Sequence, residues 1–121
     1  FLDQRVKQAM EQSDYVIVPT TVDKLDMQGT ISTIGEISGI TKNIIVVVNK
    51  VEKNQDFLEA RNLIAQIGDY PVFEINKSRV LKNIIDEKKS IIQIQKEGGL
   101  MGYTLKSLAK QFENLTQFIN N

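Results

Sequence analysis

The stretch Ile44-Ile45-Val46-Val47-Val48 decides the fold of this 121-residue chain. Its β-branched apolar residues follow one another with no polar residue between them. A strand with one face in water alternates apolar and polar residues, whereas a strand covered on both faces, as in a parallel sheet between helices, is apolar throughout. The stretch therefore predicts an inner strand of a parallel α/β sheet.

Helical and extended patterns alternate on both sides of this strand. Residues 15–18 and 72–75 are short runs rich in β-branched and aromatic residues, which predict two further strands. Residues 25–40 and 55–67 repeat apolar residues with the period of a helix. Because each return to parallel pairing needs a crossover, this order predicts an α/β fold, with helices on both faces of a parallel sheet.

The two ends of the chain carry weaker patterns. Residues 3–12 predict a short amphipathic helix and residues 103–119 a long one. Between the predicted strand at residues 72–75 and the last helix, residues 80–86 are compatible with a helix and residues 90–95 with an edge strand. The glycines of residues 98–102 predict a loop before the last helix, because they lack the lysine of a phosphate-binding loop.

Composition excludes several classes of function. The 15 basic and 15 acidic residues balance, which argues against a strongly charged polymer binder. The chain has no cysteine and no histidine, so it contains neither a thiolate site nor the commonest general base. With no apolar run of membrane-spanning length and no signal peptide, we expect a cytoplasmic protein. Because it begins Phe1-Leu2-Asp3 without methionine, we interpret residues 1–121 as a single partial domain.

Polar side chains follow each predicted strand. Their carboxyl ends share one edge of a parallel sheet, where ligands of such sheets bind. The side chains expected at this edge are those of Pro19, Thr20, Thr21, Asn49, Lys50, Asn76 and Lys77. The alternative is that the strands simply end in polar loops, as most strands do.

Asn49 is the strongest candidate for ligand binding among these residues, because its side-chain amide can donate a hydrogen bond to a nucleotide base and accept one from it. The alternative is a turn amide bonded to its own backbone. The run Asn49-Lys50-Val51-Glu52 also resembles the Asn-Lys-x-Asp guanine motif of GTPases, with Glu52 in place of the aspartate. Asp23 and Asp26 are either a carboxylate pair near the edge or caps at the start of a helix.

We predict no catalytic residue and no metal ligand in this chain. No Gly-x-x-x-x-Gly-Lys-Ser/Thr sequence occurs, so the chain lacks the loop that binds a triphosphate. Residues 77–96 contain six basic side chains against two acidic ones, a surface that could contact DNA phosphates or be merely solvated. The DNA-binding candidates are Lys77, Arg79 and Lys82.

Several segments together resemble the second half of the ParA/MinD family of deviant-Walker ATPases. They are residues 13–21 (SDYVIVPTT), Gly29, residues 44–50 (IIVVVNK), residues 90–95 and residues 102–110 (GYTLKSLAK). The resemblance implies the C-terminal portion of a P-loop NTPase-like, ParA-like domain. The phosphate loop and the magnesium-coordinating aspartate of the family would precede Phe1.

The resemblance also implies a function for the parent protein. Such a parent binds ATP and Mg²⁺, dimerises around nucleotide and uses ATP turnover in plasmid or chromosome partition. Partners would be a second copy, non-specific DNA and a partition adaptor protein. By analogy the nucleotide-binding residues are Asn49, Lys50 and Asn76, and the loop near nucleotide and dimer interface contains Pro19, Thr20, Thr21, Asp23 and Asp26. Where the family usually has a proline, this chain has Asn76.

Within the family, ParA is favoured over MinD, because residues 112–121 lack the lysine and arginine of a membrane-targeting helix.

Two other interpretations stay open. The chain could instead be the distal half of a GTPase, which competition between ATP and GTP would reveal. It could also be a standalone flavodoxin-like or receiver-like interaction domain. A fragment that exposes sheet edges is expected to self-associate.

Overall fold

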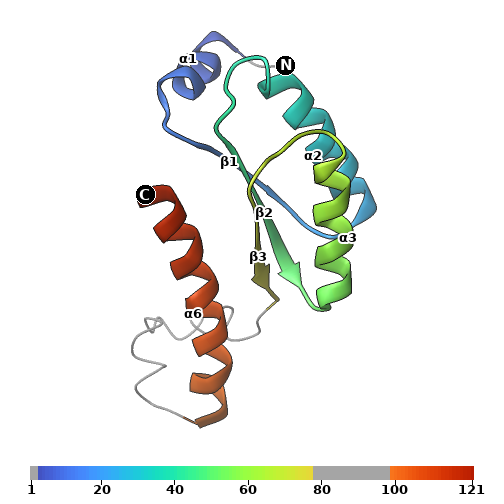
Figure 1. Cartoon of the computed structure of the whole chain (residues 1–121), viewed down its shortest axis with the longest axis vertical. Helices are drawn as coiled ribbons and strands as arrows, with labels where there is room; N and C mark the ends of the chain where they lie inside the picture. Colours follow the sequence, from blue (N-terminus) through green and yellow to red (C-terminus); the bar gives the residue numbers. More distant parts are fainter. Residues whose placement is uncertain (1–2, 78–98) are drawn as a thin grey trace. The chain divides into compact units, whose positions relative to one another are not determined.

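The computed structural model describes residues 3–77 and 99–121, and the side chains of residues 3–77 and 108–121. The chain divides into two compact units, Phe1–Glu74 and Ile75–Asn121. The described elements are α1 (Gln4–Gln12), β1 (Val16–Thr20), α2 (Lys24–Ile37), β2 (Ile44–Val51), α3 (Asn54–Ala65), β3 (Val72–Asn76) and α6 (Gly99–Asn120) (Figure 1). The helix predicted at residues 80–86 and the strand predicted at residues 90–95 lie outside the described residues.

The three strands form one parallel sheet in the order β1-β2-β3. β1 and β2 pair in parallel from Val16 opposite Ile44 to Thr20 opposite Val48. Just before β3 begins, the carbonyl of Pro71 accepts a 2.9 Å hydrogen bond from the N–H of Val46. The apolar strand is therefore the inner strand of a parallel α/β sheet, as its composition predicts.

Both faces of β2 are buried. Ile44, Val46 and Val48 belong to the main apolar cluster with residues of α2 and α3, and Val46 and Val48 have no exposed surface. Ile45 and Val47 point to the opposite face by the alternation of a strand, and they are 0% and 6% exposed. Full burial of such a side chain contributes about 1.5–3 kcal/mol, which explains why β2 tolerates no polar residue before Asn49.

Helix α2 begins at a side-chain cap and packs one stripe of residues into the core. The Asp23 carboxylate accepts hydrogen bonds from the backbone N–H groups of Leu25 and Asp26, at 2.9 and 3.2 Å. Met27 and Ile34 are buried. Leu25, expected on the apolar face, is instead 77% exposed. Nine residues separate it from Ile34, which at about 100° per residue places it on the opposite side of the helix.

Helix α3 runs beside α2 in the first unit (Figure 1) and buries Phe57, Ala60 and Ile64. The guanidinium of Arg61 lies 5.9 Å from the centroid of the Phe57 ring, a cation–π contact at the edge of the core. Ile67 lies beyond the end of α3 and is 39% exposed, although its spacing predicts a buried position. The α2 and α3 helices cover the same face of β2, since both contribute to its apolar cluster.

Strand β1 continues past the predicted range of residues 15–18, through Pro19 to Thr20. The N–H of Val16 donates to the Asn43 carbonyl at 2.8 Å, so alternate residues 16, 18 and 20 direct their N–H groups toward β2. The nitrogen of Pro19 therefore faces away from β2. Because the missing N–H is not needed for this pairing, the parallel ladder extends to Thr20.

The second unit contains the end of β3 and helix α6. Ile75 and Leu108 are buried. Helix α6 begins at Gly99, so residues 99–102 are helical rather than a loop as predicted. Glycine in a helix costs about 1 kcal/mol per residue, a penalty too small to stop propagation of a 22-residue helix. No helix in the described ranges combines the length and apolar character needed to cross a membrane.

Candidate functional site: the carboxyl edge of β1 and β2

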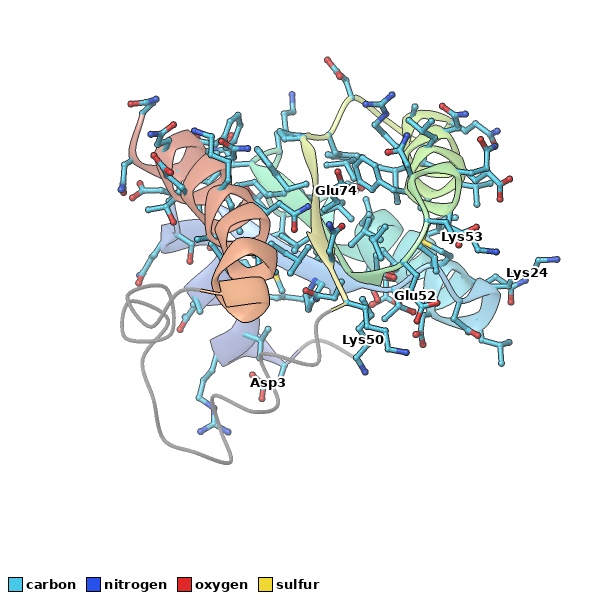
Figure 2. All side chains as sticks on the ribbon, turned by 90° about the horizontal axis from the view of Figure 1, so that it is seen from below. Asp3, Lys24, Lys50, Glu52, Lys53 and Glu74 are labelled. Carbon is cyan, nitrogen blue, oxygen red and sulfur yellow. The ribbon has the colours of Figure 1, made fainter. Side chains whose placement is uncertain are left out.

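The carboxyl ends of β1 and β2 leave the sheet at the same edge. Thr20 lies opposite Val48, so the loop after β1 and the last residues of β2 are level with one another. In Figure 2, Lys50, Glu52 and Lys53 follow one another where β2 ends and α3 begins. The prediction that polar strand ends of the first unit share an edge is therefore confirmed for β1 and β2.

The loop from β1 to α2 is held by its own polar groups. The Thr21 hydroxyl donates to the Asp26 carboxylate at 2.5 Å and accepts the N–H of Asp23 at 3.2 Å. Asp23 is the N-cap of α2. Of the two interpretations of these acids, capping by Asp23 is confirmed, and Asp26 fixes the loop through Thr21. These hydrogen bonds fix the conformation of the loop at the edge of the sheet.

Thr20 and Pro19 face different surroundings. Thr20 is 6% exposed, and its hydroxyl lies 3.8 Å from the sulfur of Met27 and 3.4 Å from the Thr21 carbonyl. Its side chain is therefore directed into the first unit's core. Pro19 is exposed. Any contact between Thr20 and a ligand at this edge has to use its backbone.

Asn49 and Lys50 are the last polar residues of β2. Asn49 lies within the strand, which extends to Val51, and not directly after it as predicted. It is half-buried. Asn49 therefore belongs to β2 and not to the turn that follows it.

Lys50 has a backbone φ of 58°, the only positive φ of a non-glycine residue within residues 3–77 and 99–121. This left-handed conformation costs an L-residue about 1–2 kcal/mol, because Cβ crowds the following carbonyl. Strained residues are concentrated at binding and catalytic sites, where surrounding structure holds them in place. Lys50 combines such strain with an exposed ammonium at the strand end.

Asn76 belongs to the second unit. Its N–H donates to the side-chain oxygen of Gln111 in α6 at 2.9 Å, and it is half-buried at the end of β3. Sequence reasoning missed Gln111, because 35 residues separate the two partners and no local pattern connects them. Lys77 is exposed. Arg79 and Lys82, the other DNA-binding candidates, lie outside the described residues.

Comparison with models of known protein families, with curated proteins and with solved structures found no match. Within the described part of the chain, no three acidic side chains are grouped as metal ligands would be. The chemistry of the edge residues is therefore the basis on which a function can be inferred.

Proposed function

We propose that this chain is part of a ParA-like ATPase acting in plasmid or chromosome partition, and that it contributes the base-side contacts to the nucleotide. The observation that carries this proposal is the parallel register, with Thr20 opposite Val48. This register brings the hydrogen-bonded loop at residues 20–26 level with Asn49 and Lys50. Open parallel sheets bind ligands beyond the carboxyl ends of their strands, and this edge has that form.

Asn49 is the residue proposed to recognise the base. An asparagine amide can donate to N7 and accept from N6 of adenine at the same time. Its half-buried position within β2 reduces the conformational entropy lost on binding. Lys50 is proposed to present a positive charge beside the nucleotide, and Asn76 is a further nucleotide contact that the family resemblance implies.

The remaining chemistry of the reaction is proposed to lie outside this chain. ATP and Mg²⁺ need a phosphate loop, which the 121 residues do not contain. The loop carrying Thr21, Asp23 and Asp26 is proposed to lie near the interface with a second copy. Lys77, Arg79 and Lys82 are proposed to contact DNA phosphates, and a partition adaptor is the proposed protein partner.

Nucleoside binding to the chain itself tests the base-side role. We expect adenosine, titrated into the ¹⁵N-labelled chain, to shift the amide signals of Asn49, Lys50 and Thr21 with a dissociation constant on the order of 1 mM. Adding phosphates to the nucleoside should change the affinity little, because no phosphate loop is present. Guanosine is expected to bind more weakly.

A matched pair of variants separates recognition from general effects. Asn49→Ala should abolish the adenosine shifts, whereas Asn62→Ala, which removes an exposed amide from α3, should leave them unchanged. Tighter binding of guanosine than of adenosine would favour the GTPase alternative. Equal and unsaturable shifts with both nucleosides would reject a nucleotide site and leave the interaction-domain alternative.

A further inference from the structure

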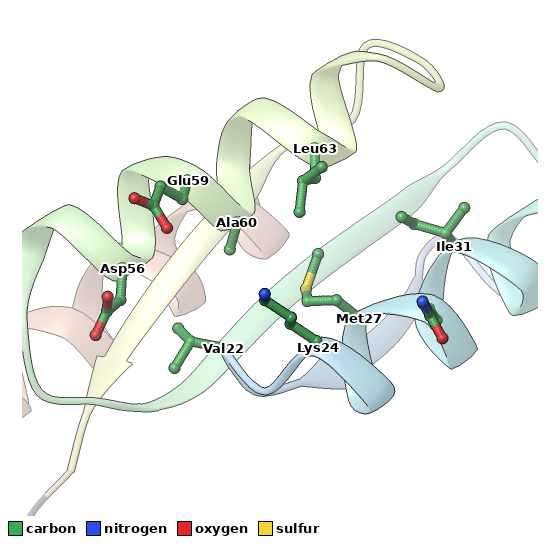
Figure 3. A pocket seen from close by; sticks show the side chains of 9 residues that line it. Val22, Lys24, Met27, Ile31, Asp56, Glu59, Ala60 and Leu63 are labelled. Atoms are coloured by element: carbon green, nitrogen blue, oxygen red, sulfur yellow. The ribbon is translucent and has the colours of Figure 1, made fainter.

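A hollow of about 310 Å³ lies between α2 and α3 in the first unit (Figure 3). This volume is at the lower end of the range of about 300–1,000 Å³ in which small-molecule sites fall. None of its lining residues is Asn49, Lys50 or Asn76, although Val22 and Lys24 lie in the segment 20–26 that follows β1. The hollow adjoins this segment, but its interpretation rests on its own lining and not on the proposed nucleotide contacts.

The inner surface of the hollow is apolar. Its apolar lining residues are Val22, Met27, Ile31, Ala60 and Leu63. Met27 and Ala60 are each 3% exposed, so they form the floor. Figure 3 shows Leu63 on α3 and Met27 on α2 pointing toward one another. Because Ala60 has only a methyl group where the two helices face each other, the gap is not filled by side chains of the first unit.

The rim of the hollow is charged. Asp56 and Glu59 lie on one side, three residues apart on α3, and Lys24 lies on α2 (Figure 3). Two carboxylates and one ammonium give a net charge of −1. Among the ion pairs of the described residues, none joins Lys24 to either carboxylate. Glu59 accepts a 3.4 Å hydrogen bond from the Gln55 amide, which is at the weak end of the range.

The start of each helix is near this rim, and its partial positive charge has to be considered. At α2 the Asp23 carboxylate accepts two of the free N–H groups, which offsets the dipole. At α3 the first turn contains Asp56. Glu59 lies beyond that turn, where the dipole has largely fallen off. The potential over the carboxylate side of the hollow therefore stays negative.

We propose that this hollow binds a small organic cation, a guanidinium or ammonium group attached to a short apolar body. The planar guanidinium fork can bond two carboxylate groups at once, and Asp56 and Glu59 lie on one face of α3 at the spacing of neighbouring turns. The apolar body covers Leu63, which is 41% exposed, and rests on Met27 and Ala60. A single ligand of this kind would therefore contact both the apolar floor and the carboxylates of the rim.

Three probes of similar length test the proposal: hexylguanidinium, neutral hexylurea and anionic hexanoate. They are titrated into the chain, with the methyl signals of Met27 and Ala60 observed by NMR. We expect hexylguanidinium to bind about three- to tenfold more tightly than hexylurea, as a charge-assisted pair at a partly exposed site allows. Hexanoate should bind least. Equal affinities for all three, or tighter hexanoate, would overturn the proposal.

Variants assign the preference to the rim. The double change Asp56→Asn and Glu59→Gln should equalise hexylguanidinium and hexylurea, while Glu36→Gln, an exposed acid of α2 outside the hollow, should preserve the preference. Lys24→Gln should tighten hexylguanidinium binding by at least about twofold, because it removes the repelling charge. The methyl signals of the buried Ile34 report whether each variant keeps its fold. A preference that survives the double change would also reject the site.

Discussion

At the scale of single residues, Lys50 stands apart because its backbone is strained at the point where β2 reaches the candidate edge. Its φ of 58° is a conformation that glycine adopts without penalty. Lys50→Gly should therefore raise the free energy of unfolding by about 0.5–1 kcal/mol, after subtraction of the entropy that glycine adds to the unfolded chain. Urea denaturation followed by circular dichroism measures the change.

The matched control for this prediction is Lys50→Ala. Alanine removes the ammonium and keeps Cβ, so the strain persists and the stability should change by no more than a few tenths of a kcal/mol. Equal stabilisation by both substitutions would mean that the charge, and not the backbone, is unfavourable. Because Lys50→Gly also removes the ammonium proposed to lie beside the nucleotide, this variant should be more stable and yet bind adenosine more weakly.

The sequence predicts where some site residues lie, but not their backbone conformations or side-chain contacts. The hydrophobic pattern places Asn49 and Lys50 at a strand end, because a run of buried residues must stop where the chain meets water. It cannot show the positive φ of Lys50, since neither glycine nor a turn signal accompanies it. It also cannot show that the Thr20 side chain turns inward to Met27, a contact between two different elements.

At the scale of elements, α2 carries two glycines that the first unit does not require. A Cβ added at Gly29 or Gly35 meets no heavy atom within 4 Å outside the helix's own backbone. Gly35→Ala should therefore stabilise the chain by about 0.5–1 kcal/mol through the entropy of the unfolded state, and thermal denaturation should show a higher midpoint. Gly29→Ala is expected to behave in the same way.

Gly68→Ala provides the contrast. There a new Cβ would approach Cε2 of the Tyr70 ring to 2.5 Å, and Tyr70 packs against the apolar cluster. The ring would have to move, so we expect a loss of about 1 kcal/mol. Destabilisation by Gly35→Ala comparable to that of Gly68→Ala would show that α2 packs more tightly than the structure indicates.

The elements themselves were largely predictable, and their ends were not. The periodicity of apolar residues predicts α2 and α3 between the strands, and the short apolar runs predict the positions of β1, β2 and β3 along the chain. The ends differ where hydrogen bonding continues past the pattern. β1 includes Pro19 because its nitrogen faces the outer edge, and α6 begins at Gly99 because helix propagation outweighs the weak propensity of glycine.

At the scale of the whole molecule, the sequence predicts the α/β class and the parallel sheet, and the structure confirms both. The reason is that a strand buried on both faces consists of consecutive apolar residues, and β2 contains such a run. The hollow between α2 and α3 was not predictable, because it arises where the small side chain of Ala60 on α3 faces α2, and the pattern of one helix does not show what faces it. ParA-like identity, ATP binding and partition remain proposals.

The outer edge of β1 leads to a prediction about association. Within the described sheet, β1 pairs with β2 alone, and Ile17 is 45% exposed. Such an edge offers unpaired backbone groups beside an apolar side chain, which favours pairing with another copy. We expect the chain to self-associate between micromolar and millimolar concentration, and sedimentation velocity over this range measures it.

Substitutions on the surface identify the contact that drives this association. Ile17→Lys places a charge on the edge strand, a common natural means of blocking edge pairing, and should shift the sedimentation profile toward the monomer without unfolding the chain. Leu25→Lys adds the same charge to α2, where Leu25 is 77% exposed, and should leave association unchanged. If both variants dissociate the complex equally, overall charge controls association; if neither does, the edge of β1 is not the contact.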